Sequence, residues 1–147
     1  MTDDEQLAIN RHVIEQFRAG GPVDGMHRDR LVLLTMRGRR SGEPRTTPML
    51  VVDDEPTGLR FVVASGAGSP QAPGWFHNLV DEPVVHVEAD GEEYDAVARV
   101  AAGRERAALW ERLVDAYPFF TDHEAQAGRE LPLVILDRVA PPDGPAA

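Results

Sequence analysis

The stretch LVLLTMRGRRSGEPRTTPMLVV, residues 31–52, decides the fold of this chain. It contains two runs rich in Leu, Val, Thr and Met, separated by a segment with Gly38, Gly42 and Pro44. Two short apolar runs joined by glycine and proline are typical of a β-hairpin. The stretch therefore predicts two antiparallel strands connected by a polar turn.

The same pattern continues along the chain beyond this hairpin. Short runs rich in Val, Leu and Ile are separated mostly by turns, with few helical segments between them. The predicted strands are six in number and cover residues 31–36, 46–52, 59–65, 84–88, 94–101 and 131–139. A parallel doubly wound sheet would need a crossover helix between most strand pairs. We therefore expect a mainly β fold, a small antiparallel barrel with flanking helices.

Three helices are predicted around this sheet. Thr2 and Glu5 form a capping box at the start of an N-terminal amphipathic helix, and residues 73–80 and 104–116 have helical spacing. The apolar positions of the N-terminal helix are Leu7, Ile9, Val13, Ile14 and Phe17. This helix either covers the core or contacts a membrane surface or a substrate, because amphipathicity alone does not separate these roles.

Length and composition limit the class of protein. A chain of 147 residues and 16.1 kDa predicts one domain over residues 1–140, followed by a flexible tail at 141–147. A net charge of -10 argues against nucleic-acid binding, which needs a basic face. The chain has neither Cys nor Lys, so thiolate and Schiff-base chemistry are excluded. The five His residues show no metal-binding spacing, so no metal site is predicted.

The expected location follows from the start of the chain and from its longest apolar runs. The first twenty residues are polar and acidic, unlike a secretory signal. The longest apolar runs have four or five residues, whereas a membrane-spanning helix needs about 20. We expect a cytoplasmic protein without an integral membrane segment, with peripheral membrane contact left open.

Positive charge is concentrated in the predicted hairpin turn. Arg37, Arg39, Arg40 and Arg45 lie close together in an otherwise acidic chain. Guanidinium groups form bidentate contacts with phosphate or carboxylate, which predicts a site for an anion with several oxygens. The alternative is a solvated turn whose arginines pair with nearby Asp and Glu side chains.

Two further segments are candidates for ligand contact. Residues 64–68, ASGAG, follow a predicted strand and would let a ligand approach backbone amides, or they form a plain flexible connection. Residues 116–128, AYPFFTDHEAQAG, crowd aromatic side chains after a helix. These aromatics either stack on a flat ligand or fill the core.

Four blocks, residues 33–49, 61–79, 83–88 and 109–132, carry a resemblance. In order they include GRRSG, PRTTP, ASxxG, WxxNL and AYP, and by this combination the chain resembles the deazaflavin (F420)-dependent nitroreductase and quinone reductase family of actinobacteria. The resemblance implies a split β-barrel, similar to FMN-binding proteins, that binds coenzyme F420, an 8-hydroxy-5-deazaflavin with a phosphate and an oligoglutamate tail. The cofactor-binding residues it implies are Arg39, Arg40, Ser41, Arg45, Thr46, Thr47, Pro48, Met49, Ser65, Gly66, Ala67, Gly68, Trp75 and Asn78.

The activity implied by the resemblance is hydride transfer from reduced F420 to a quinone, a nitro compound or a conjugated carbonyl. Tyr117 or His123 would donate a proton, unless water does, and Ser65 would stabilise developing negative charge. Phe120 and His123 stand where relatives have tyrosines in the substrate pocket. We therefore expect activity on planar quinones and conjugated carbonyls to exceed activity on bulky nitroimidazoles.

Two alternatives to this function stay open. The first is a split-barrel oxidoreductase that uses FMN, although four arginines are more than its single phosphate needs. The second is a non-catalytic protein that binds or carries F420. In each case the expected partner is a small molecule, and the protein is expected to be a monomer or a homodimer.

Overall fold

The structure, a computed structural model, describes residues 3–24, 26–89 and 91–139. The strands in these ranges are β1 (Leu31–Arg37), β2 (Pro44–Leu50), β3 (Val52–Asp54), β4 (Leu59–Val63), β5 (Val84–Ala89), β6 (Glu92–Val100) and β7 (Leu133–Arg138). The helices are α1 (Asp3–Arg18), α2 (Gly74–Asp81), α3 (Gly103–Ala116) and α4 (Phe119–Ala127), with short 3-10 turns η1 (Arg28–Arg30) and η2 (Gly66–Gly68). The predicted tail at 141–147 and the capping residue Thr2 lie outside the described residues.

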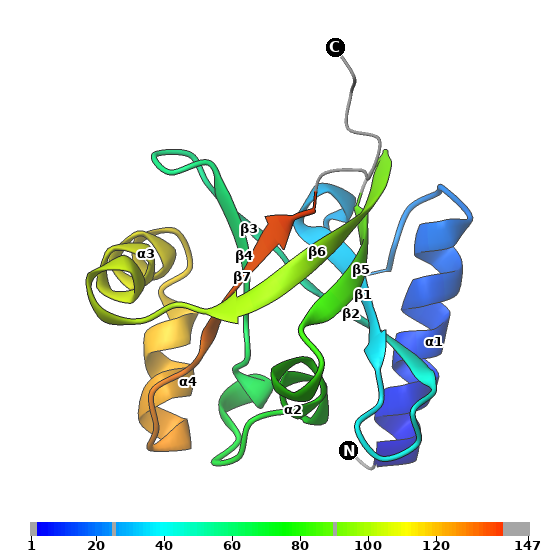
Figure 1. The fold of residues 1–147 in the computed structure, drawn as a ribbon, viewed down its shortest axis with the longest axis horizontal. Helices are drawn as coiled ribbons and strands as arrows, with labels where there is room; N and C mark the ends of the chain where they lie inside the picture. The colour runs from blue at the N-terminus through cyan, green and yellow to red at the C-terminus, as the bar shows by residue number, and fades with distance from the viewer. Residues whose placement is uncertain (1–2, 25, 90, 140–147) are drawn as a thin grey trace.

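The seven strands form one antiparallel sheet in the order β2-β1-β5-β6-β7-β4-β3. Its two edge strands, β2 and β3, are consecutive in the chain and are separated only by Val51. In a flat sheet these edges would lie about 29 Å apart at about 4.8 Å per strand, whereas one residue spans about 3.5 Å. The sheet is therefore curled into a half-barrel, as Figure 1 shows.

The concave side of the sheet holds the main core. Along β1, the buried side chains of Val32, Leu34 and Met36 point to this side, as strand alternation requires. Helix α2 lies at one end of the half-barrel, between its two halves (Figure 1). Its Leu79 is buried in this core, and Trp75 packs against it. The position of α2 follows from this burial, because the helix closes an end that would otherwise expose apolar surface.

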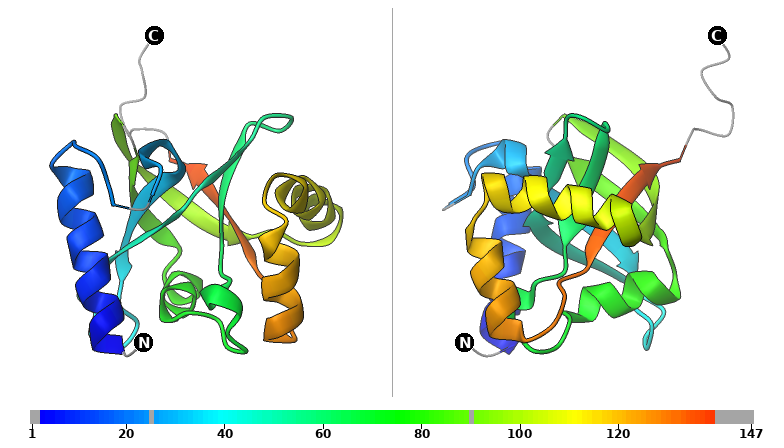
Figure 2. Two further views of the ribbon diagram at one scale, coloured as in Figure 1. Left: turned by 180° about the vertical axis from the view of Figure 1, so that it is seen from behind. Right: turned by 90° about the vertical axis from the view of Figure 1, so that its left-hand side faces the viewer.

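The convex side is covered by helices at two places. Helix α1 packs on β1 with Val13 and Phe17, and α3 and α4 pack over β4 and β7 (Figure 2). Leu7 and Ile9, which the sequence placed on the same apolar face of α1, are exposed. Only the second half of α1 therefore packs against the sheet. Within the described part of the chain, no helix has the length and apolar character needed to cross a membrane.

The prediction of a mainly β antiparallel fold with an N-terminal helix is confirmed, with two differences. The run 46–52 was expected to be one strand, but it divides at Val51, whose N–H donates to the carbonyl of Arg30 at 2.8 Å. The second difference is α4, which the sequence did not predict. Pro118 precedes it directly and the helix has only nine residues, too few to establish a helical period.

A buried carboxylate joins the sheet edge to α3. Asp54, at the end of β3, has a side chain that is only 4% exposed. It accepts hydrogen bonds from Arg112 Nε at 2.6 Å and Nη2 at 2.9 Å, and another from the hydroxyl of Thr57. The Arg112 guanidinium holds the pKa of Asp54 below its usual range, against the opposing effect of burial.

We predict that Asp54→Asn lowers the free energy of unfolding at pH 7 by about 1 to 2 kcal/mol, because a charge-assisted pair is lost. The pKa of Asp54 is lower in the folded protein, so its stabilisation is present above the unfolded pKa of about 3.9 and is lost as pH falls through the folded value. Urea unfolding at pH 7 and pH 3 should show the difference between parent and variant shrinking in acid.

The matched control is Asp53→Asn, because Asp53 is an exposed neighbour that pairs with Arg60 at the surface. We expect this change to alter stability by less than about 1 kcal/mol. An equal loss of unfolding free energy in both variants would contradict the account of this ion pair. So would a destabilisation by Asp54→Asn that is the same at pH 7 and pH 3.

Candidate functional site

The turn between β1 and β2 is tightly structured. Gly38 N–H donates to the carbonyl of Glu43, and Gly42 N–H donates to the carbonyl of Gly38, both at 2.8 Å. A Cβ on Gly38 would lie only 2.9 Å from Ser41 Oγ, so the turn requires glycine there. Ser41 Oγ in turn accepts from the N–H of Glu43 at 3.2 Å. These bonds fix the backbone from which the arginines project.

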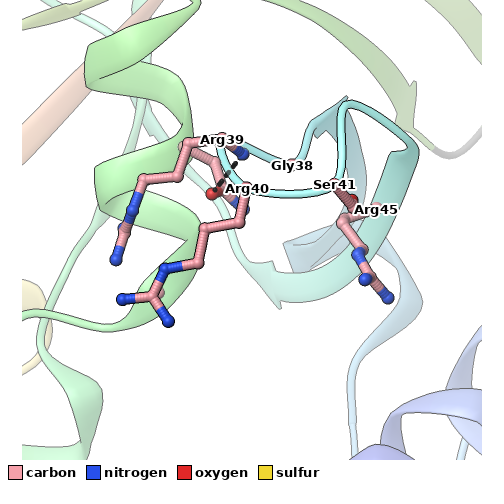
Figure 3. Close-up of a pocket in the computed structure, with 7 residues that line it drawn as sticks. Gly38, Arg39, Arg40, Ser41 and Arg45 are labelled. Atoms are coloured by element: carbon pink, nitrogen blue, oxygen red, sulfur yellow. Dashed lines mark hydrogen bonds between the residues drawn. The ribbon is translucent and has the colours of Figure 1, made fainter.

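A pocket of about 240 Å³ lies between this turn and α2. Figure 3 shows the turn beside the helix, with the N–H of Arg39 donating to Asn78 Oδ1 at 3.1 Å. The lining residues are Gly38, Arg39, Arg40, Ser41, Arg45, Gly74 and Asn78. Five of the predicted cofactor-binding residues therefore meet here, four from residues 39–45 and the fifth, Asn78, from α2. We call this the arginine pocket.

The arginines of this turn have no carboxylate partner among the described residues. Arg37, Arg39, Arg40 and Arg45 are exposed and form no ion pair there. Elsewhere, ion pairs with Asp or Glu are made by Arg18, Arg60, Arg99, Arg106, Arg112 and Arg138. The alternative of a turn neutralised by its neighbours is therefore wrong for this structure. Clustered, unneutralised guanidinium groups are suited to binding an anion.

Strand β2 leads away from the arginine pocket along the edge of the sheet. Strand β1 pairs with it on one side only, so the outward N–H and C=O groups of β2 have no strand partner in the part of the chain that the structure describes. The four predicted residues Thr46, Thr47, Pro48 and Met49 lie on this strand but do not line the pocket. Thr46 Oγ1 is 2.8 Å from Thr35 Oγ1, so this hydroxyl is occupied on the face opposite to the concave core.

The predicted segment 64–68 forms a loop that packs against α4. Gly66 and Gly68 have positive φ angles of 56° and 83°, which favour glycine. A Cβ on Gly68 would lie 3.0 Å from Oε1 of Gln126, a residue of α4. The structure thus brings two candidate segments, 64–68 and 116–128, side by side. Neither lines the arginine pocket.

A second pocket, of about 210 Å³, lies at the far end of β2. Its lining is mostly apolar and consists of Met26, His27, Arg30, Leu50, Tyr117 and Phe119. The Arg30 guanidinium lies 6.0 Å from the centre of the Tyr117 ring. We call this the aromatic pocket. The sequence did not point to Met26, His27 or Arg30, because they stand in an irregular connection with no recognisable motif.

The three predicted catalytic residues do not converge on one pocket. Tyr117 lines the aromatic pocket, whereas Ser65 and His123 line neither pocket. His123 packs edge-on against Phe119 and Phe120, and its buried Nδ1 has no hydrogen-bond partner within the described ranges. Phe120 is 5% exposed and belongs to the core between the sheet and α4. Of the two alternatives for these aromatics, stacking on a flat ligand or filling the core, Phe120 takes the second.

Trp75 and His86 both have structural partners in the described part of the chain. Trp75, a predicted cofactor contact, packs against the concave core through α2. His86 lies on the convex face of β5, with Nδ1 2.9 Å from Asp95 Oδ1 and Nε2 3.0 Å from Glu93 Oε1. Hydrogen bonds to these carboxylates raise the pKa of His86. Among the residues with assigned positions, no cluster of His, Asp and Glu is arranged to hold a metal ion.

The fold is that of a family of reductases that depend on reduced F420. The family described as F420H(2)-dependent quinone reductase matches residues 8–138, which is most of the chain. The chain belongs to this family. The resemblance identified from the sequence blocks is thereby confirmed.

Individual relatives agree with this assignment. A Mycobacterium tuberculosis (strain H37Rv) protein, provisionally named F420H(2)-dependent quinone reductase Rv3178, is 36% identical over 105 residues, covering 71% of this chain and 87% of the relative. The solved structure of an F420-H2 dependent reductase, FDR-A, has a TM-score of 0.65 and 32% identity, covering 77% of this chain and 100% of that one. A structure described as a domain-swapped dimer has a TM-score of 0.67 and 30% identity, covering 92% of this chain and 100% of that one. These matches confirm the predicted fold class.

We predict that Gly68→Ala destabilises the protein more than Gly58→Ala does. Both glycines have positive φ, of 83° and 73°, so both changes should cost about 1 to 2 kcal/mol in backbone strain. Only at Gly68 would the added Cβ also meet Gln126, because nothing lies within 4 Å of a Cβ at Gly58. Urea unfolding of both variants measures the difference.

The greater destabilisation by Gly68→Ala should disappear when the change is made in a Gln126→Ala background, since the shortened side chain at position 126 leaves room for the methyl group. If Gly58→Ala and Gly68→Ala lower the free energy of unfolding of the parent equally, the loop is not packed as closely against α4 as the structure indicates.

Proposed function

We propose that the protein is a reductase that binds reduced F420 along β2 and transfers its hydride to a quinone. The observation that carries the proposal is the arginine cluster, which has no carboxylate partner among the described residues, whereas six other arginines pair with Asp or Glu. The family membership of residues 8–138 supports the choice of cofactor.

The arginine pocket fits the phosphate and the oligoglutamate tail of F420. Arg39, Arg40 and Arg45 offer charged donors, and Ser41 and Asn78 add neutral polar groups. The amide groups at the start of α2, near Gly74, provide further donors, because the first N–H groups of a helix have no partner within it. In a protein with net charge -10, this pocket concentrates positive potential where a polyanion would bind.

The course of β2 supports the placement of the ring. Arg45, near its start, lines the arginine pocket, and Leu50, its last residue, lines the aromatic pocket. Five residues at about 3.4 Å each span about 17 Å between these two ends. A cofactor with its tail at Arg45 would extend its ring along the unpaired edge of β2 toward the aromatic pocket, where backbone N–H groups could meet the ring's polar edge.

The aromatic pocket is the proposed site of the quinone. Bound reduced deazaflavin supplies a hydride, and a quinone that accepts it together with one proton becomes the hydroquinone. Tyr117 and Phe119 offer ring faces and edges for a planar substrate, and Arg30 can donate to a quinone oxygen that gains negative charge. Tyr117 can also supply the proton through its hydroxyl, as can water.

The nature of the partner follows from the same charge distribution. Four of the arginines that form no ion pair among the described residues, Arg37, Arg39, Arg40 and Arg45, are gathered at one turn. Such a compact cluster favours a small polyanionic ligand over nucleic acid. The similar structure described as a domain-swapped dimer supports a homodimer as one of the two expected states, beside a monomer.

We predict that the protein binds F420 more tightly than FMN, and that the affinity falls with added salt as the arginine contacts are screened. Arg45→Ala removes a charge-assisted contact worth roughly 1.5 to 3 kcal/mol, so the Kd for F420 should rise about 10- to 150-fold. Fluorescence titration of F420 and FMN into parent and variant measures both effects.

The matched control is Arg104→Ala, which removes the same charge from an exposed site on α3 away from both pockets. Its Kd for F420 should equal that of the parent. Equal affinity of the parent for F420 and FMN would favour the FMN alternative, and tight F420 binding without oxidation of the reduced form by menadione would favour a carrier.

We predict that Phe119→Ala raises KM for menadione about 2- to 10-fold with reduced F420 saturating, because an aromatic contact of roughly 0.5 to 1.5 kcal/mol is lost. Phe119 is 44% exposed, so the change should leave the fold intact. The control Val84→Ala removes an exposed apolar side chain that lines neither pocket and should leave KM unchanged. An unchanged KM in Phe119→Ala would place the quinone elsewhere.

A further inference from the structure

Arg129 binds the loop that contains η2 at four backbone positions. Its Nη2 lies 3.3 Å from the carbonyl oxygen of Ala64 and 3.2 Å from those of Ser65 and Gln71. Its Nε donates to the carbonyl of Ser69 at 3.2 Å. One side chain therefore contacts the backbone on both sides of η2 and holds the two ends of the loop together.

These contacts are made without a carboxylate. Among the described residues Arg129 has only carbonyl oxygens as acceptors, whereas the neighbouring Arg106 pairs with Glu124 and Glu130. Because its acceptors are neutral, the charge of Arg129 adds to the positive potential beside the loop. The four loop carbonyls that accept hydrogen bonds from Arg129 already have a hydrogen-bond partner within the protein.

The place of Arg129 in the chain explains how it reaches the loop. Helix α4 ends at Gly128, whose φ of 65° is the left-handed conformation that terminates many helices. Arg129 follows directly, and α4 itself contacts η2 through Gln126 beside Gly68. The loop is thus held both by α4 and by the Arg129 guanidinium.

We propose that Arg129 is a positioning residue that fixes the 64–71 loop in the conformation needed to place the deazaflavin ring, without contacting the cofactor. The inference rests on the proposed function and on the family resemblance, which implies that residues 65–68 of this loop contact the cofactor. This role of Arg129 differs from that of Arg45, which lines the arginine pocket and would bind the anionic tail. The two residues should therefore respond differently to the two parts of the cofactor.

The test compares Arg129→Gln, Arg129→Lys and Arg45→Ala for binding of F420 and of the deazaflavin chromophore without phosphate and tail. Arg129→Gln should weaken both compounds by the same factor, because the ring is common to them. Arg45→Ala should weaken F420 only. Arg129→Lys keeps the charge but cannot reproduce the fork of contacts to four carbonyls, so it should rescue Arg129→Gln in part.

Turnover separates positioning from simple loss of stability. With reduced F420 and menadione both saturating, kcat of Arg129→Gln should fall about 10- to 100-fold, as expected for a displaced reacting group, while KM for menadione stays unchanged. The control Arg112→Gln breaks the ion pair with Asp54 away from both pockets. It should lower the melting temperature but leave kcat per folded molecule as in the parent.

Hydrogen exchange tests the loop without any cofactor. Peptides covering residues 62–72 should exchange faster in Arg129→Gln and not in Arg112→Gln. Unchanged exchange there, or a chromophore Kd and kcat that match the parent, would overturn the role of Arg129. If the parent binds neither F420 nor the chromophore, the proposed function fails, and the exchange result alone then decides whether Arg129 orders the loop.

Discussion

The structure depends on one constraint, the single residue that links the two edge strands of the sheet. Val51 joins β2 to β3, and its N–H is held by the carbonyl of Arg30. Because the two edges must meet, the sheet has to curl, and the curl creates a concave core that α2 closes at one end. Disruption of this link would open the half-barrel and separate the elements that form the site.

The same curl assembles the site from segments that are distant in the chain. The β1–β2 turn reaches α2, where Asn78 Oδ1 accepts from the N–H of Arg39. Strand β2 runs from there to Tyr117, at the junction of α3 and α4. The edge strand β2 therefore has charged donors near its N-terminal end and aromatic rings near its C-terminal end. This polarity matches a ligand with an anionic tail and a flat ring, and it is the physical basis for the proposed reductase activity.

Local patterns were sufficient to predict much of this fold. Short runs rich in Val, Leu and Ile at residues 31–36 and 84–88 predicted strands that the structure contains as β1 and β5, and the glycines of residues 38–42 indicated the tight turn. Helix α4 could not be predicted, since nine residues after a proline contain too little periodicity. The arginine turn was identified from composition, but only the geometry shows that it has no carboxylate partners among the described residues.

Other features depend on tertiary contacts that no local pattern contains. Phe120 and Phe119 are adjacent and chemically identical, yet one is 5% exposed and the other 44% exposed, which only the packing of α4 decides. The four carbonyl contacts of Arg129 join segments about sixty residues apart in the chain. Arg30 reaches Tyr117 through an irregular connection that has no motif.

The central claim, that β2 carries the cofactor between the two pockets, is tested most directly by a crystal structure of the protein with F420 bound. We expect phosphate and tail oxygens within hydrogen-bonding distance of Arg40 and Arg45, and the ring beside residues 46–49 with its far end toward Tyr117. A complex in which the tail avoids the arginine pocket, or in which the ring lies away from β2, would contradict the account.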